Sequence, residues 1–390
     1  MTAARPGDRS GSSTPTLGGF TTGQLVRLCD VVGLEPADAE IYARVLIEAL
    51  GPSAERPLDR PPPSESLLSD DHTPVEFSLS FLPDAVPTLR LLLEPGCGAH
   101  GPTQSGRTGL RVVREMAQRW DIATGQLDEL EDLFFPASAE GPFALWCALE
   151  LRPGGVPRVK VYLNPAASGQ EHSAGTVREA MRRLGHPRAF ASLPEADGYP
   201  YFALDLGDWD TPRAKVYLRH DDLSAAEAGR LPRTSPGHVG CAETEEFFRT
   251  AAGLGAGPGE NAVLGGGRTQ SCHAFTETAS GLASGFTLYV PVRDSVGHDG
   301  EALARAEAVL ERRGVDTAPL LRSLEAVTSR LPQDGVGLIA YLSLTHHRGR
   351  PPRVNAYISS EAYAVRPPVT RRPVGVTVKT SRTECAGEWM

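Results

Sequence analysis

The chain has 390 residues, 40% of them hydrophobic and 22% charged, and a formal net charge of −9 at pH 7. This length and composition allow either two ordinary domains or one large closed one. The negative charge argues against nucleic acid as the main partner. Because no apolar run approaches the ~20 residues of a membrane span and no signal-peptide pattern opens the chain, we expect a cytoplasmic protein with no membrane partner.

Two features argue against disulfide and metal sites. The six cysteines are scattered without a C-x-x-C pair, which favours reduced thiols. The acidic pairs Asp70-Asp71 and Asp221-Asp222 continue as His-Thr-Pro and Leu-Ser-Ala, so neither completes a D-D-x-x-D magnesium motif. We therefore interpret both pairs as surface or helix-start residues.

A seven-residue pattern recurs along the chain and predicts a repeated structural unit. Each copy alternates polar and apolar residues and is rich in β-branched or aromatic side chains, which is typical of a strand. The two most similar copies contain two of the three lysines in the chain, Lys160 and Lys215, whereas arginine occurs 36 times. The five copies are Pro87–Leu93, Pro157–Leu163, Pro212–Leu218, Ser284–Val290 and Pro352–Ile358.

A second strand and a turn precede each copy, so each unit contains a hairpin. The expected partner strands are Glu76–Phe81, Phe143–Leu151, Tyr201–Leu206, His273–Thr278 and Leu338–Leu344. In the last of these hairpins we expect His346-His347 to lie in the turn, exposed to solvent.

Helical spacing of apolar residues separates the hairpins, and we expect two helices and two strands in each unit. The helical segments include 110–120, 177–184, 243–252, 302–310 and 320–331. Five hairpins give an α+β fold, a closed barrel of ten antiparallel strands in five ααββ repeats with helices outside. Such a barrel is wider than the ~8 strands whose side chains just fill the interior, so it encloses a cavity.

The predicted domain spans residues 19–365, between a disordered N-terminus, 1–18, and a C-terminal tail, 366–390. The Pro/Ser-rich stretch from 52 to 66 is expected to be mobile.

Alternation of side chains decides what lines the cavity. Positions two, four and six of the repeat share one face, so Arg213, Lys215 and Tyr217 point the same way. In a barrel covered by helices the apolar face must point outward, and the polar face lines the lumen. A lumen with several cations, several tyrosines and few acids suits an anion beside an aromatic or carbocationic group.

These motifs resemble the indole prenyltransferases of the dimethylallyltryptophan synthase type, in particular a bacterial member with a prenyltransferase barrel. The resemblance rests on the K-x-Y strands, the Pro-Val-Glu-Phe-Ser segment at 74–78, Leu-Arg-Leu-Leu-Leu-Glu-Pro at 89–95 and the five-unit plan. It implies transfer of a dimethylallyl group from dimethylallyl diphosphate to tryptophan or another indole, without metal or other cofactor.

The resemblance also implies roles for individual residues. Glu76 looks like the carboxylate that accepts a hydrogen bond from the indole N–H. Four tyrosines, Tyr162, Tyr217, Tyr289 and Tyr357, look like a shield around the allyl cation. The diphosphate-binding residues are expected to be Arg90, Lys160, Arg213, Lys215 and Thr287, although Thr287 replaces a common glutamine.

The acceptor and its reacting carbon stay open. Relatives that alkylate carbon 4 carry a lysine on the strand before the first K-x-Y strand, and Phe143–Leu151 has none, so we expect carbon 6 or 7. One alternative is a prenyltransferase for a phenol or a phenazine. The other is a non-catalytic phosphate-binding barrel, which gives no role to Glu76 or to the tyrosines.

Overall fold

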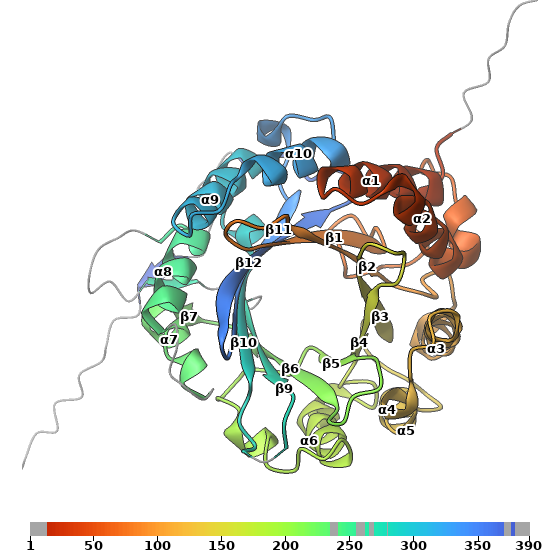
Figure 1. The fold of residues 1–390 in the computed structure, drawn as a ribbon, viewed down its shortest axis with the longest axis vertical. Coiled ribbons are helices and arrows are strands. Elements are labelled where there is room, and N and C mark those ends of the chain that lie inside the picture. Colours follow the sequence, from red (N-terminus) through yellow and green to blue (C-terminus); the bar gives the residue numbers. More distant parts are fainter. Residues whose placement is uncertain are drawn as a thin grey trace, which may run out of the picture.

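The structure, a computed structural model, describes residues 14–234, 241–254, 262–264, 269–278, 280–369 and 376–378. Ten antiparallel strands form a closed barrel, and helices surround it (Figure 1). The barrel strands are β1 (Val75–Phe81), β2 (Thr88–Leu93), β3 (Leu145–Glu150), β4 (Arg158–Leu163), β5 (Phe202–Asp205), β6 (Arg213–His220), β9 (Thr269–Phe275), β10 (Gly285–Val290), β11 (Ile339–His347) and β12 (Arg350–Ser359). The sequence-based prediction of the barrel is confirmed.

Each barrel strand pairs with its neighbour in chain order, and β1 pairs with β12 to close the ring. The five repeat copies form β2, β4, β6, β10 and β12, as predicted. The least clear partner strand, expected at His273–Thr278, instead runs from Thr269 to Phe275 as β9. A small sheet outside the barrel, which the sequence analysis did not predict, contains β7 (Leu223–Ser224), β8 (Ala262–Leu264) and β13 (Val376–Val378).

The helical layer is less regular than two helices per unit. The longer helices are α1 (Leu17–Val31), α2 (Pro36–Leu50), α3 (Gly101–Arg119), α6 (Ser173–Arg183), α8 (Cys241–Ala252), α9 (Asp299–Glu311) and α10 (Ala318–Val327). Single-turn helices are α4 (Gly125–Asp128), α5 (Glu131–Phe134) and α7 (Ala225–Ala228). Two long helices therefore occur only in the first and last units of the described chain. In the third, a 3₁₀ turn at Phe190–Ser192 follows α6 in place of a second helix.

The outward strand face is apolar, as expected for a barrel inside a helical layer. Val159, Val161, Ala214 and Val216 are all at most 2% exposed. In β2 and β4 the inward residues alternate with them and are less buried. This alternation commits one face of each strand to helix packing, which leaves the other face for the cavity.

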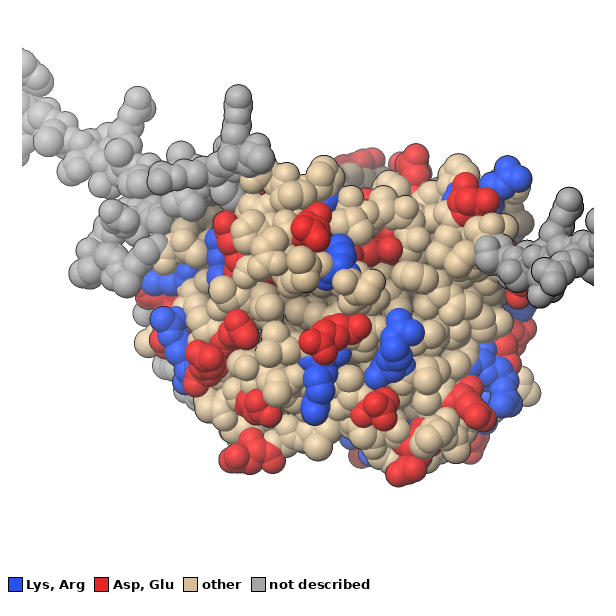
Figure 2. All heavy atoms as spheres, turned by 90° about the horizontal axis from the view of Figure 1, so that it is seen from above, with Lys and Arg blue, Asp and Glu red and all other residues tan. Residues whose placement is uncertain are grey.

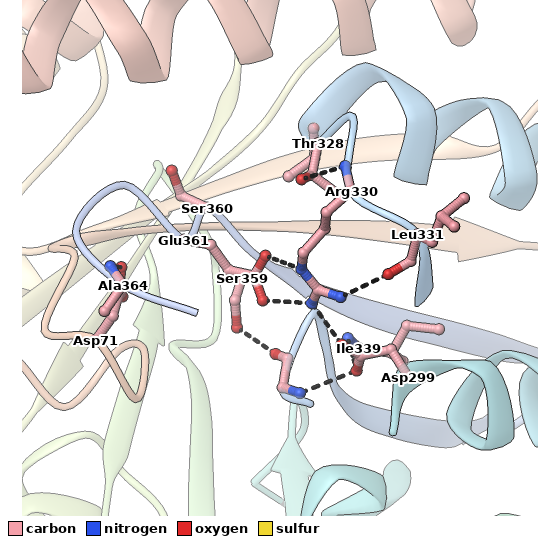
Figure 3. Close-up of polar contacts among 12 residues, drawn as sticks. Asp71, Asp299, Thr328, Arg330, Leu331, Ile339, Ser359, Ser360, Glu361 and Ala364 are labelled. Carbon is pink, nitrogen blue, oxygen red and sulfur yellow. Dashed lines mark hydrogen bonds and ion pairs between the residues drawn. The ribbon is translucent and has the colours of Figure 1, made fainter. Parts of the chain in front are cut away.

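A buried ionic cluster in the last unit links α9 to the segments that follow α10 and β12 (Figure 3). Arg330, just after α10, donates to Glu361 at 2.6 and 2.8 Å and to Asp299 at 2.5 Å. Asp299 in turn accepts from the backbone N–H of Gly337, immediately before β11. Nearby, Gln24 on α1 donates to the backbone oxygens of Val327 and Ser360. These contacts hold the two ends of the ring together.

Three sequence expectations need correction. His346 and His347 are the last residues of β11 and do not lie in the turn, and His346 is only 8% exposed. Helix α1 begins at Leu17, inside the segment expected to be disordered. The stretch expected to be mobile is held by its contacts, because Arg56 accepts from the Leu17 backbone N–H and Ser66 donates to buried Glu94 at 2.5 Å.

Charge on the outer surface is mixed. On the face drawn in Figure 2, acidic and basic residues are interspersed over the helices. Such a face offers no single-sign field of the kind that binds nucleic acid. Among the described helices, none combines the length and the hydropathy that crossing a membrane requires. Most of the tail predicted from 366 onward lies outside the described residues; 366–369 and 376–378 are described.

Candidate active site

The barrel encloses a cavity of about 560 Å³. Its lining includes every residue predicted to bind diphosphate or to form the tyrosine shield: Arg90, Lys160, Arg213, Lys215, Thr287, Tyr162, Tyr217, Tyr289 and Tyr357. They come from β2, β4, β6, β10 and β12, whose inward faces meet in the lumen. Residues up to about 270 positions apart in the chain thus share one chamber, because the repeat places positions two, four and six of each copy inward.

Arg90 is held by an acid that the sequence analysis missed. Its Nε and Nη2 donate to Glu150 on β3 at 3.2 and 3.0 Å, and its Nη1 donates to Asn355 at 3.1 Å. Burial alone lowers the pKa of the guanidinium, but Glu150 opposes this and raises it. Arg90 is therefore a fixed positive charge with a defined orientation in the empty cavity.

Lys215 is paired in the same way. Its Nζ donates to both carboxylate oxygens of Asp205, at 2.7 and 2.8 Å. Burial raises the pKa of Asp205, but Lys215 and Lys160 outweigh it and hold that pKa at about 2. Burial lowers the pKa of Lys215 itself, against the opposing effect of Asp205. The short contacts keep the pair ionised.

The remaining cations lie against aromatic rings. Lys160 has its Nζ 5.5 Å from the centre of the Tyr162 ring and makes no ion pair among the described residues. The guanidinium of Arg213 lies 4.3 Å from the ring of Trp209. Among the described residues, neither Lys160 nor Arg213 therefore has an ion-pair partner to exchange before it binds an anion.

Thr287 and Asn355, the fourth-position residues of the last two copies, belong to a neutral network. Thr287 donates to Thr345 at 3.0 Å, and Asn355 donates to Ser343 at 2.8 Å and to Thr345 at 3.2 Å. Thr287, Thr345 and Asn355 thus present hydroxyl and amide groups to the cavity, next to Arg90, which donates to Asn355.

The tyrosines form one continuous band. The ring centres of Tyr162 and Tyr217 are 5.6 Å apart, those of Tyr217 and Tyr289 5.8 Å, and those of Tyr289 and Tyr357 also 5.8 Å. Tyr201, next to β5, and Tyr341 on β11 extend the band, with edge contacts to Tyr217 and Tyr357 respectively. Neither tyrosine lies in a repeat copy, so the repeat did not predict that they belong to the band.

Glu76 lies beyond the band, on the inward face of β1, two residues before the cavity-lining Ser78. It is 5% exposed, and burial raises its pKa to about 8 although nearby Arg293 lowers it. Arg293 itself is 6% exposed, lies 5.0 Å from the Tyr341 ring and pairs with Asp70 at 3.4 Å. Glu76 is not among the residues that line the cavity, so it is a desolvated carboxyl on the far side of the tyrosine band from the paired cations.

The missed acids had a signal in the sequence. Glu150 and Asp205 lie on the partner strands at positions that face the same way as Ala148 and Ala203, and the strand pairing brings them beside Arg158 and Arg213. Extending the inward alternation to both strands of each hairpin identifies them. The cavity therefore contains more acid than the repeat copies alone suggest.

The sequence and fold of this chain are similar to those of known proteins. A family profile for tryptophan dimethylallyltransferase matches residues 38–233. The structure is similar to that of the prenyltransferase PriB in ternary complex with L-tryptophan and dimethylallyl thiolodiphosphate, with 60% identity, a TM-score of 0.89, and coverage of 92% of this chain and 100% of PriB.

Two further solved structures are similar over most of both chains. A 5-dimethylallyltryptophan synthase from Streptomyces coelicolor is 61% identical over 92% of this chain and 99% of its own, with a TM-score of 0.87. A 6-dimethylallyltryptophan synthase from Micromonospora olivasterospora is 38% identical over 90% and 99%, with a TM-score of 0.82. The chain therefore belongs to the tryptophan dimethylallyltransferase family, and it is an enzyme of that type.

Proposed function

We propose that this enzyme transfers the dimethylallyl group of dimethylallyl diphosphate to the indole ring of L-tryptophan by electrophilic aromatic substitution. The observation that carries the proposal is a cavity lined by fixed cations and a tyrosine band, with the desolvated carboxyl of Glu76 beyond the band. The ternary complex of PriB with L-tryptophan and a thiolodiphosphate analogue supports the choice of both substrates.

The cations promote the first step, in which the bond between the allylic carbon and the diphosphate oxygen breaks. Diphosphate leaves with the bonding electron pair, so negative charge grows on it while the allyl group becomes cationic. Lys160, Lys215, Arg90 and Arg213 bind that charge, with Thr287 as a neutral donor. A charge pair at ~4 Å contributes on the order of 4 kcal/mol at an effective dielectric of 20, so several oriented cations lower the barrier substantially.

The tyrosine band acts on the other fragment. Electron-rich ring faces attract a cation, by about 2 kcal/mol each when water is excluded. Because Tyr162, Tyr217, Tyr289 and Tyr357 lie in contact with one another, they also exclude the water that otherwise captures the allyl cation. The fragment then reacts with the indole ring, which loses a proton to recover aromaticity.

Glu76 accepts the indole N–H hydrogen bond in this scheme. A carboxylate at that nitrogen enriches the ring in electron density as the ring attacks the cation. With its pKa raised to about 8, the group gains this acceptor strength as it ionises.

The sequence pattern predicted carbon 6 or 7, but neither synthase named above acts at carbon 7 by its name, so for the reacting carbon we favour the benzene edge of the indole at carbon 5 or carbon 6. The two relatives named above act at these two positions according to their names, and the one at carbon 5 is the more similar of the pair. The absence of a lysine from β3 supports a position other than carbon 4.

Incubation with dimethylallyl diphosphate and L-tryptophan in the presence of EDTA tests the proposal. We expect a monoprenylated tryptophan, and its NMR spectrum identifies the carbon. Turnover only with phenols or phenazines contradicts the indole acceptor, binding of diphosphate without any turnover contradicts catalysis, and turnover that needs added Mg²⁺ contradicts the metal-independent scheme.

A further inference from the structure

The fourth repeat copy leaves a gap in the cationic lining of the cavity. Copies two and three each place arginine at position two and lysine at position four, and copy five places Arg353 at position two. Copy four instead has Gly285 and Thr287. All of these residues line the cavity, so one part of the wall lacks the cation that the repeat supplies elsewhere.

The imidazole of His347 occupies this gap. His347 on β11 is the direct cross-strand partner of Gly285 on β10, and both line the cavity. A Cβ atom at residue 285 would lie 2.5 Å from His347 Nδ1 and 2.7 Å from Cε1, closer than any side chain tolerates. Glycine at 285 therefore lets the ring lie over its backbone, and a larger residue there would displace the imidazole.

The surroundings of His347 keep the ring neutral while the cavity is empty. Burial lowers its pKa to about 4, and Arg353, Lys215 and Arg350 lower it further against the effect of Asp205. The other charged groups that line this part of the cavity are Arg348 and Glu277, which pair at 3.8 Å. Added diphosphate reverses the local field, since its negative charges outweigh the cations that repel the proton.

We propose that His347 is a diphosphate-binding residue that takes up a proton when diphosphate enters the cavity and donates the resulting N–H to a phosphate oxygen. The imidazole thus replaces the arginine that copy four lacks. The inference rests on the diphosphate site of the proposed function and adds to it a proton that enters the site together with the ligand. The enzyme then binds diphosphate more tightly at lower pH, in the range where the ring is neutral when free and protonated when bound.

Calorimetric titration of the enzyme with inorganic pyrophosphate at about pH 6 tests the uptake of a proton by His347. The same titration in buffers of different ionisation enthalpy gives the number of protons taken up on binding. Pyrophosphate itself titrates, so the quantity of interest is the difference between wild type and His347→Gln. We expect wild type to take up more protons, by up to about one per ligand, and to bind about tenfold more tightly. His347→Lys, a permanent cation, should restore affinity without restoring the proton.

His346→Gln is the matched control, since that neighbouring ring points away from the lumen, 3.3 Å from Thr244 Oγ1. It should show the proton uptake of wild type. Equal proton uptake by wild type and His347→Gln overturns the inference, whether or not affinity changes. If wild type does not bind pyrophosphate at all, the diphosphate site of the proposed function fails with it, so the two failures are distinguishable.

Discussion

The two ends of the site, the cation-lined cavity and the buried Glu76 beyond the tyrosine band, treat charge in opposite ways. At the cationic end, defined by Arg90, Lys160 and Lys215, two of the three cations have an acid at hydrogen-bonding distance, and the side chains of the Lys215–Asp205 pair are 17% and 23% exposed. At the other end Glu76 is 5% exposed and its pKa is raised to about 8. The first end is ionised before substrate arrives, whereas the charge of the second depends on pH and on the ligand.

This difference matches the two halves of the proposed reaction. The leaving group is an anion throughout, so permanent and oriented cations stabilise it without reorganisation. The indole ring of the acceptor is neutral until it attacks the allyl cation. A carboxyl that ionises near neutral pH can stabilise the positive charge that then develops on the ring. The tyrosine band lies between the two ends and keeps their charges apart.

The largest expected effect comes from removing a cation at the paired end. Lys215→Met should lower kcat/KM for dimethylallyl diphosphate by about 10³-fold, because the leaving group loses a cation and then faces the uncompensated charge of Asp205. Steady-state kinetics on protein of verified thermal stability measures this. The double variant Lys215→Met/Asp205→Asn should recover part of the loss, and no recovery would mean that repulsion by Asp205 plays no part.

Glu76→Gln tests the other end of the site, where the carboxyl is expected to act on tryptophan. We expect kcat/KM with tryptophan to fall by about 10²-fold, since an amide is a weaker acceptor and cannot ionise. The wild-type rate should rise with pH and level off above about 8, as the carboxyl ionises, and the variant should lack this dependence. A pH-rate profile that is the same for both proteins would remove Glu76 from the mechanism.

Glu76→Gln should lower activity but raise the stability of the folded protein at high pH. Since the folded pKa of Glu76 is raised from 4.5 to about 8, the folded state holds a proton that the unfolded state releases. Wild type therefore loses stability as pH rises through this range, and Glu76→Gln does not. Thermal melting at about pH 8.5 should give the variant a Tm a few degrees higher than wild type. A lower Tm at that pH contradicts the buried, protonated carboxyl.

The band between the two ends is tested by Tyr217, the tyrosine that touches both Tyr162 and Tyr289. Tyr217→Leu should lower kcat about 30-fold, the equivalent of ~2 kcal/mol, and should increase the share of dimethylallyl alcohol formed by water capture. Tyr217→Phe keeps the ring and is the matched control, with a smaller effect. Product analysis by chromatography separates the alcohol from prenylated tryptophan, and an unchanged ratio in the leucine variant argues against shielding.

How far the sequence predicts the molecule depends on which residues repeat. The barrel and the inward strand face are predicted by an alternating pattern that occurs five times in the sequence. The same pattern predicts that Lys160 and Tyr217 point into the lumen. Glu150, Asp205 and Tyr341 escaped because they lie on strands without a repeated motif, and only the cross-strand register brings them to the site. His347 was assigned to a turn because β11 continues past Leu344, and the strand end depends on pairing with Gly285, which the local sequence does not encode.

The smallest expected effect sharpens the contrast by removing an acid from the cationic end. Glu150→Gln should tighten pyrophosphate binding by about fivefold, since the cavity wall loses a negative charge while Arg90 keeps its hydrogen bond to Asn355. Calorimetry measures the change, and raising ionic strength should reduce it. Weaker binding in the variant would mean that Glu150 serves chiefly to orient the guanidinium. Glu150 and Asp205 would then be positioning residues, and the acids at this end would be part of the binding site for the leaving group.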